Sequence, residues 1–305
     1  MQSVFSMYKF LQIACFFCCF QASFYGQSPL GYQLEEGDIF LVEQQAEQQI
    51  VQSLDGNSHQ LTNRISGVLQ FRVMQVRDTT YLLEFMFRDL VFQIESSLQG
   101  VLLDIHASEP EPSDTQSQIF SAMLNVPVQM ELGRQGKIHK VNGGDSLVAR
   151  VVEQAGLTDG FNKTVMRKTL EQEYGSRALA QSYEQMTFFY PDRPIAVGDQ
   201  WKNTYEGKLS TENSWQLDSL NTDRAVIRGT ATLKMKTADP SSSMDLEGTQ
   251  TTTLLTSRPS GFLKEMKVEN QASGISTSAQ TGDLEIPTTI ISTVTYRLIE
   301  QKHVQ

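Results

Sequence analysis

The sequence predicts a mainly β (α+β) fold, with two antiparallel, curved β-sheet units bridged by a short helical region. Three observations lead to it. Apolar and polar residues alternate along much of residues 27–142, helical spacing replaces the alternation over residues 143–189, and the alternation returns over residues 190–305. Alternation is typical of a strand with one buried face, and a spacing of three and four residues is typical of an amphipathic helix.

The first β unit shows the alternation most clearly in TYLLEFMF, residues 80–87. Aromatic and branched side chains occupy every second position there, as expected for an antiparallel sheet. Within residues 80–87 this face consists of Tyr81, Leu83, Phe85 and Phe87. Leu69, Phe71 and Val73 alternate with polar or longer side chains in the same way just before it. Val101, Leu103 and Ile105 continue the pattern.

A linker and a hairpin follow. Residues 107–117 read ASEPEPSDTQS, and their two prolines and three acids predict an exposed linker. Glu109, Glu111 and Asp114 lack the glycine and the ligand spacing of a calcium loop, so a solvated linker is favoured over a calcium site. Residues 127–141 predict a β-hairpin that turns at GRQG.

Three helices are expected in the helical region. The first has one apolar face and ends at Gly156. The second ends near Gly175, and the third precedes PDRP, residues 191–194, whose prolines close the region. The apolar face of the first helix consists of Leu147, Val148, Val151, Val152 and Ala155.

The second β unit begins with a motif that resembles the start of the first. GDIF opens the first unit at residue 37, and GDQW opens the second at residue 198. We interpret this as an internal repeat, or as two equivalent sheets. Locally, the glycine permits a turn, the aspartate caps the turn, and the aromatic residue is the first to enter the core.

The first 26 residues predict a signal peptide. Lys9 precedes an apolar run, residues 10–20, that is shorter than the roughly 20 residues of a membrane span. The three cysteines, Cys15, Cys18 and Cys19, all lie in this segment. Lipidation of Cys15 is an alternative, although the apolar run continues past it. We expect an exported protein: periplasmic, outer-membrane-associated or secreted, with no transmembrane span in the mature chain.

The formal net charge of −10 argues against nucleic acid as a partner, because nucleic-acid binding depends on Lys and Arg contacts to phosphates. It also argues against electrostatic docking to anionic lipid. Acidity otherwise keeps a protein soluble and names no partner.

One motif suggests catalysis. GGDSLVAR, residues 143–150, is similar to the nucleophile block of the GDSL esterases and lipases, and Ser146 would be the nucleophile. That family pairs the serine with an Asp three residues before a C-terminal His, whereas Glu300 stands three residues before His303. We therefore favour Asp145 or Ser146 as a helix cap and keep a serine hydrolase as an alternative.

No metal or cofactor site is predicted. The histidines are His59, His106, His139 and His303, and no two of them have the spacing of metal ligands. Asp104 and His106 share a strand face, but two ligands make no zinc site. Neither a P-loop nor a dinucleotide-binding glycine motif is present.

Large aromatic residues are the remaining candidates for function. They would either fill the core, which we favour, or line a cavity between sheet and helices that suits an acyl chain. These residues are Phe85, Phe87, Phe92, Phe188, Phe189, Tyr190, Trp201 and Trp215.

Several motifs together resemble a family of uncharacterised exported bacterial proteins, often lipoproteins, that carry a domain of unknown function. The motifs are GDIF, LGRQGKIHKVNG, LEQEYGSRALAQSYEQM, FFYPDRPIAVGDQW, GFLKEMKVENQASG and IPTTIISTVTYRL, across most of residues 32–299. The resemblance implies no activity and transfers no catalytic residue. The expected architecture is more distantly similar to periplasmic lipoprotein-carrier folds, which hold acyl chains.

We therefore expect a non-enzymatic envelope or secreted protein that binds a hydrophobic small molecule, a lipid or an envelope protein. The alternatives are a serine hydrolase that uses Ser146 and a purely structural scaffold module. No catalytic, cofactor-binding or metal-ligating residue is assigned.

Overall fold

The computed structural model describes residues 29–54, 56–239, 242–278 and 284–304. The predicted signal peptide, residues 1–26, and its three cysteines lie outside the described residues. Export and lipidation of Cys15 therefore stay predictions.

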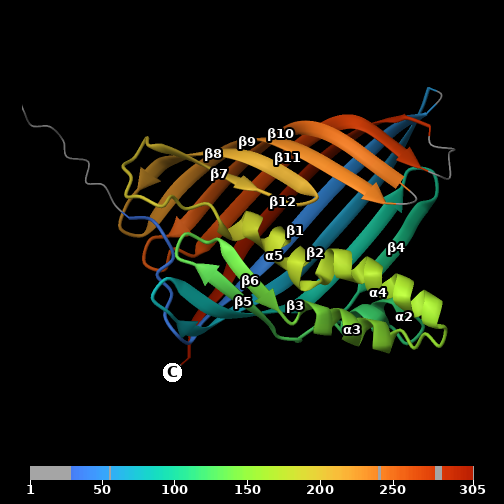
Figure 1. The fold of residues 1–305 in the computed structure, drawn as a ribbon, viewed down its shortest axis with the longest axis horizontal. Helices are drawn as coiled ribbons and strands as arrows, with labels where there is room; N and C mark the ends of the chain where they lie inside the picture. Colours follow the sequence, from blue (N-terminus) through green and yellow to red (C-terminus); the bar gives the residue numbers. More distant parts are fainter. Residues whose placement is uncertain (1–28, 55, 240–241, 279–283, 305) are drawn as a thin grey trace, which may run out of the picture.

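A single antiparallel sheet of twelve strands dominates the molecule, which is mainly β as predicted (Figure 1). Across the sheet the order is β6-β5-β3-β2-β1-β12-β11-β10-β9-β8-β7, and β4 pairs with β3. The strands are β1 (Asp38–Leu54), β2 (Asn57–Val76), β3 (Thr80–Ser96), β4 (Gly100–His106), β5 (Val128–Gly133), β6 (Ile138–Asn142), β7 (Gln200–Tyr205), β8 (Leu209–Leu220), β9 (Arg224–Asp239), β10 (Ser242–Ser257), β11 (Leu263–Ser278) and β12 (Ile286–His303).

The prediction of two separate sheet units is not confirmed. β1 pairs with β12 from Asp38 opposite His303 to Gln52 opposite Thr288, and this ladder joins the strands of both halves. Both strands bury alternate side chains on the same face of the sheet. Pairing them therefore satisfies the backbone N–H and C=O groups along two strand edges and extends the core. The internal repeat is not confirmed either, because GDIF opens the central strand β1 and GDQW opens the edge strand β7.

The two Gly-Asp motifs do form the same local structure. Gly37 and Gly198 have φ of 90° and 93°, which favours glycine. The amide of Asp38 donates to the carbonyl of Glu35, and that of Asp199 to the carbonyl of Ala196, at 3.1 Å in both cases. Each aspartate carboxylate also accepts a hydrogen bond from the backbone three residues earlier, at 2.9 and 3.0 Å. The following aromatic residues, Phe40 and Trp201, are buried as predicted.

A layer of helices covers one face of the curved sheet, which we call the concave face (Figure 1). The helices are α2 (Thr115–Ser121), α3 (Gly144–Gln154), α4 (Gly160–Tyr174) and α5 (Ser176–Thr187). The last three lie where helical spacing predicted them. A 15-residue helix such as α4 is about 22 Å long, whereas the 20 residues of β2 extend about 65 Å. The helices therefore cover only part of the concave face.

The core consequently forms two clusters. The larger one packs the helices on the sheet and contains the inner faces of α3 and α5. The smaller one lies elsewhere on the concave face and contains Leu233, Leu246, Ala272 and Ile290.

The predicted linker, residues 107–117, contains the start of the short helix α2. The Asp114 carboxylate accepts a hydrogen bond from the amide of Ser117 at 3.0 Å and so caps the helix. Ser117 is fully buried, and its hydroxyl accepts a hydrogen bond from the amide of His106. The prediction of a solvated linker was therefore wrong at its C-terminal end, where a local cap orders the chain.

Candidate functional site

The strand register fixes which side chains line the concave face. On β1, Ala46 lies on the same face as the buried residues Phe40 and Val42. Ala46 pairs with Ile65 of β2 and with Val294 of β12, and paired residues of an antiparallel ladder point to the same side. Ile65 in turn pairs with Phe92 of β3.

A run of partly exposed apolar residues lies on this face beyond the helices. Ile65, for example, keeps 36% of its surface accessible although it points to the concave side. We call this surface the trough; its apolar residues are Ala46, Ile50, Leu61, Ile65, Phe92, Ile94, Leu103 and Val294, and the hydrogen-bonded side chains of Gln48 and Asn63 lie among them on the same face. Apolar side chains in a concave, incompletely covered surface are typical of a ligand-binding groove.

Next to the trough, a pocket of about 190 Å³ lies between the sheet and the helices α4 and α5. Ile65 belongs to both surfaces. Apolar side chains from β2, β3 and α5 line part of the pocket, among them Leu69, Leu90 and Leu179, and the polar residues of the lining include Asp89 and Glu173. An apolar cavity of ~150 Å³ holds one benzene. The pocket therefore has room for a few carbon atoms, and a longer ligand would extend into the trough.

Three tyrosines contribute to the pocket lining: Tyr174 at the end of α4, Tyr183 on α5 and Tyr296 on β12. Their hydroxyls make no hydrogen bond to any other residue that the structure describes. The remaining described tyrosines donate to backbone carbonyls: Tyr32 to Thr187, Tyr81 to Tyr32, Tyr190 to Gly261 and Tyr205 to Phe188.

Burial keeps the pocket tyrosines neutral. Desolvation raises the pKa of Tyr174 and the pKa of Tyr296 to about 12. It also raises the pKa of Tyr183, with a further contribution from the nearby Tyr296 and Tyr174. The pocket therefore offers three neutral hydroxyls, each able to donate a hydrogen bond.

A row of amide side chains crosses the concave face between the two core clusters. Asn63 donates to Gln48 at 3.0 Å, Asn270 donates to Ser292 at 3.2 Å, and Asn213 donates to Asn203 at 3.0 Å. The side-chain oxygens of Gln250 and Asn270 are buried without a protein partner among the described residues. Such groups need a water or a ligand to satisfy them.

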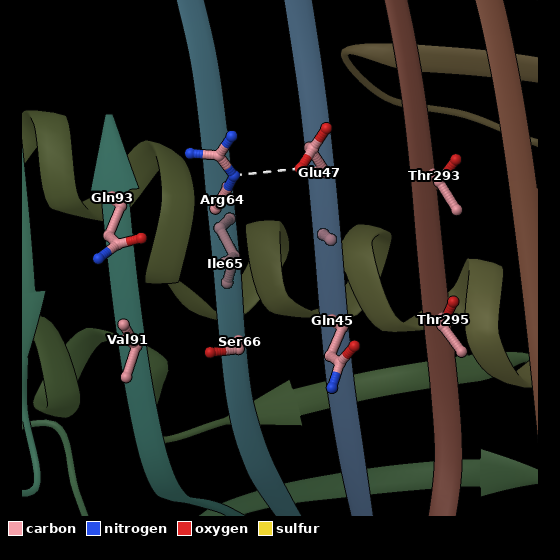
Figure 2. A pocket seen from close by; sticks show the side chains of 10 residues that line it. Gln45, Glu47, Arg64, Ile65, Ser66, Val91, Gln93, Thr293 and Thr295 are labelled. Atoms are coloured by element: carbon pink, nitrogen blue, oxygen red, sulfur yellow. Dashed lines mark hydrogen bonds and ion pairs between the residues drawn. The ribbon is translucent and has the colours of Figure 1, made fainter. Parts of the chain in front are cut away.

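The outer face of the sheet is hydrophilic by comparison. Figure 2 shows an open groove of about 410 Å³ between two rows of side chains that include Gln45, Ser66 and Thr295 on one side and Glu47, Arg64 and Thr293 on the other. Arg64 forms exposed ion pairs with Glu47 and Glu95, each at 3.1 Å. A second outer groove of about 750 Å³ is lined largely by threonines and other polar residues of β7–β10. Both grooves are larger than the pocket, but they lie open on the outer face, whereas the pocket lies between the sheet and the helices α4 and α5, so the pocket remains the better ligand site.

Most of the aromatic residues singled out in the sequence fill the core, as favoured. Phe85, Phe189, Tyr190, Trp201 and Trp215 are buried. Phe87 is also buried and lines the pocket, Phe92 lies in the trough, and Phe188 is half-buried. Sequence reasoning missed the three pocket tyrosines. The only signal for any of them is that Tyr183 shares a helical face with Leu179, and this signal indicates a core position rather than a ligand site.

The structure places Ser146 in the exposed first turn of α3. Its hydroxyl contacts neither an imidazole nor a carboxylate of the described residues. The expectation that Asp145 or Ser146 caps this helix was wrong: Gly143 is the N-cap, and the Asp145 carboxylate accepts a hydrogen bond from the amide of Ser176 at 3.3 Å.

The polar clusters of the described chain give no further site. No group of three or more His, Asp or Glu residues in this part of the protein could hold a metal ion. Asp104 and His106 share a strand face as predicted and lie 3.0 Å apart, both largely exposed. Over the same residues, no helix is both long and apolar enough to cross a membrane.

Comparison with known proteins identifies a family and a fold. The model of a family of unknown function, DUF6263, matches residues 78–263. No curated protein matches. Among solved structures the chain is similar to lipovitellin, in a study of its lipid–protein interactions, with a TM-score of 0.51 and 9% identity. The match covers 90% of this chain and 26% of the lipovitellin chain, so this chain spans about a quarter of that protein.

An outer membrane channel from Pseudomonas putida F1 also matches, with 10% identity over 88% of this chain and 97% of the channel. Its TM-score is 0.24, too low to indicate a common fold.

Proposed function

Since the chain belongs to the family of unknown function DUF6263, whose name carries no activity, we propose from its geometry that the protein binds an apolar ligand such as a fatty-acyl chain. The proposed site is the concave face. One end of the chain enters the pocket beneath α4 and α5, and the rest lies along the trough.

One observation carries this proposal: apolar side chains stay partly exposed on the concave face. Ile65, Phe92 and Ile94 point to the same side as the core and yet remain partly accessible. Covering them would be favourable by about 25 cal/mol per Å² of apolar surface. A ligand with a chain of methylene groups provides that cover without adding a strand or a helix.

The pocket tyrosines suggest a polar group on the ligand. Their neutral hydroxyls have no protein partner in the described structure, and the three tyrosines line the pocket. A carboxyl, ester or hydroxyl oxygen would accept hydrogen bonds from them. An amphipathic molecule with one oxygen-bearing end therefore suits the site better than a pure hydrocarbon.

The similarity to lipovitellin agrees with this proposal at the level of fold. A long, curved sheet with a concave apolar face can hold lipid, and at 9% identity the likeness extends no further. We also propose that binding is not coupled to catalysis, because the exposed Ser146 lacks a described base. The proposed location is the cell envelope or the exterior, on the strength of the predicted signal peptide.

The experiment compares two isoleucines with equal exposure on opposite faces. Ile65, in the trough, is 36% exposed, and Ile275, on the outer face of β11, is 38% exposed. Delipidated protein is titrated with a fluorescent fatty acid, and Ile65→Gln is compared with Ile275→Gln. We expect Ile65→Gln to raise the Kd about tenfold, since one apolar contact of ~1.4 kcal/mol is lost, and Ile275→Gln to leave it unchanged.

Failure of the unmodified protein to bind any fatty acid, or equal losses in both variants, would reject the trough as the site. A fluorophosphonate probe gives the second readout. Labelling of the protein that Ser146→Ala abolishes would replace the binding function with a hydrolase.

A further inference from the structure

The charged residues of the pocket lining are all acidic. Asp89 on β3 and Glu173 on α4 line the pocket, and no Lys, Arg or His is among the lining residues that the structure describes. The other polar groups of the lining are neutral: the three tyrosine hydroxyls and the side chains of Gln44, Ser66 and Ser182. An anion bound in the pocket would therefore meet no positive partner in its wall.

Both acidic side chains already have partners within the protein. Glu173 forms an ion pair with Lys208 at 2.5 Å, and Lys208 does not line the pocket. The Asp89 carboxylate accepts hydrogen bonds from the amide of Leu90 at 2.8 Å and from the hydroxyl of Ser108. A bound cation would have to compete with Lys208 for one carboxylate and with two hydrogen bonds for the other. The pocket is therefore no better suited to a cation than to an anion.

The tyrosines show that water has little access to this part of the pocket. Desolvation by burial raises the pKa of Tyr174, Tyr183 and Tyr296. An ionised group placed beside their hydroxyls would lose its hydration and gain no opposite charge, which costs far more than burying an uncharged oxygen. The oxygen of an ester or an alcohol, in contrast, accepts hydrogen bonds from these hydroxyls without needing a charged partner.

We propose that the pocket selects an acyl or alkyl ligand whose oxygen-bearing end is uncharged, an ester or an alcohol, over a free fatty acid. This inference rests on the proposed function and specifies its ligand class. A free fatty acid still binds, but more weakly. Its carboxylate either loses its hydration in the pocket or stays outside and leaves the tyrosine hydroxyls without an acceptor.

The missing cation, rather than repulsion, accounts for most of the selectivity. The Glu173 side chain is 58% exposed, so water and salt screen its charge. Asp89 is half-buried and adds some repulsion against a bound carboxylate. A positive charge placed in the lining should consequently restore the binding of an acid.

Three ligands that differ only at one end test the proposal. Palmitic acid, its methyl ester and cetyl alcohol compete with an uncharged fluorescent alkyl probe on delipidated protein, at about pH 8, where carboxyl groups are ionised. All three are supplied from cyclodextrin, which keeps them monomeric. We expect the ester and the alcohol to bind at least roughly tenfold more tightly than the acid. Either order between the ester and the alcohol supports the proposal and identifies the class of the ligand.

A lysine introduced into the lining provides the second readout. Ser182 lines the pocket from α5 and is exposed, so Ser182→Lys adds a cation without disturbing the core. This variant should bind palmitic acid roughly tenfold more tightly than the unmodified protein does and should bind the ester equally well. The matched control is Thr164→Lys, which makes the same charge change at an exposed position about 15 Å along α4 from Tyr174. It should leave all affinities unchanged.

Equal affinities for the acid and the ester would overturn the proposal, and so would a Ser182→Lys variant whose affinity for the acid does not change. Tighter binding of a long-chain amine than of cetyl alcohol would replace the proposal with a cation site. The two proposals fail differently: if no ligand binds, the proposed function is rejected, whereas equal binding of acid and ester rejects only the selectivity.

Discussion

The core tyrosines and the pocket tyrosines differ in hydrogen bonding. Tyr81 and Tyr190, in the core, donate to backbone carbonyls at 2.7 and 2.6 Å. Tyr183 and Tyr296, in the pocket, have no protein partner among the described residues. The first pair therefore stabilises the fold, and the second pair has bonding capacity left for a ligand.

The same contrast extends along a single strand. On β2, Phe71 is covered by the helices. Its ring centroid lies 5.2 Å from that of Phe85 and 6.4 Å from that of Tyr183. Six residues earlier, Ile65 points to the same face and is 36% exposed. One concave surface thus contains a packed part that holds the fold together and an open part that it does not need for stability.

The largest effect is expected from truncation on the covered side. Phe71→Ala should lower the free energy of unfolding by about 3–5 kcal/mol, because the cavity left in the core cannot close. Ile65→Ala should cost less than about 1.5 kcal/mol, since the side chain is already partly solvated. Urea denaturation of both variants measures the difference. Equal costs would show that the trough is packed as tightly as the core.

A smaller effect is expected from removing single hydroxyls. Tyr81→Phe leaves the carbonyl of Tyr32 and the amide of Leu34 without their partner, which should cost about 1–3 kcal/mol. Tyr183→Phe breaks no hydrogen bond among the described residues and should change stability by less than about 0.5 kcal/mol. Its effect should fall on the affinity for an oxygen-bearing ligand. A larger loss of stability from Tyr183→Phe than from Tyr81→Phe in denaturation experiments would contradict the division into core and pocket tyrosines.

A further effect is expected in the pH dependence. Burial raises the pKa of Tyr174 and of Tyr296 from 10.0 to about 12, so between these values the unfolded chain ionises before the folded one. Their contribution to stability is complete below pH 10 and is lost as the pH rises towards 12. Tyr174→Phe with Tyr296→Phe should make this decline shallower. An unchanged slope of unfolding free energy against pH would show that these hydroxyls are already solvated.

Local features of the fold could be predicted from the sequence, because each depends on neighbouring residues. The alternation at residues 80–87 predicted β3, the GRQG turn predicted the β5–β6 hairpin, and both Gly-Asp motifs predicted their turns. The pairing of β1 with β12, which joins the two halves of the sheet, could not be predicted, because Asp38 and His303 are remote in sequence. The cap that begins α2 was missed because prolines and acids usually mark a linker.

The candidate site was only partly predictable for the same reason. Its tyrosines come from α4, α5 and β12, and no short motif connects Tyr174 with Tyr296. Alternation correctly directs Ile65 inward, but a register shift between β2 and β3 at Val68/Leu69 turns Phe92 inward where the alternation of Phe85 and Phe87 would turn it outward. Alternation also cannot show that the helices stop before covering these residues. That information lies in the relative lengths of helices and strands after the sheet has assembled.

Photo-crosslinking tests the central claim most directly. A fatty acid that carries a diazirine on its chain is bound to the protein and activated, and the crosslinked residues are identified by mass spectrometry. We predict crosslinks on the concave face, at Ile65, Phe92 and the neighbourhood of Tyr174. Crosslinks confined to outer-face residues such as Ile275 and Ile291 would contradict the account.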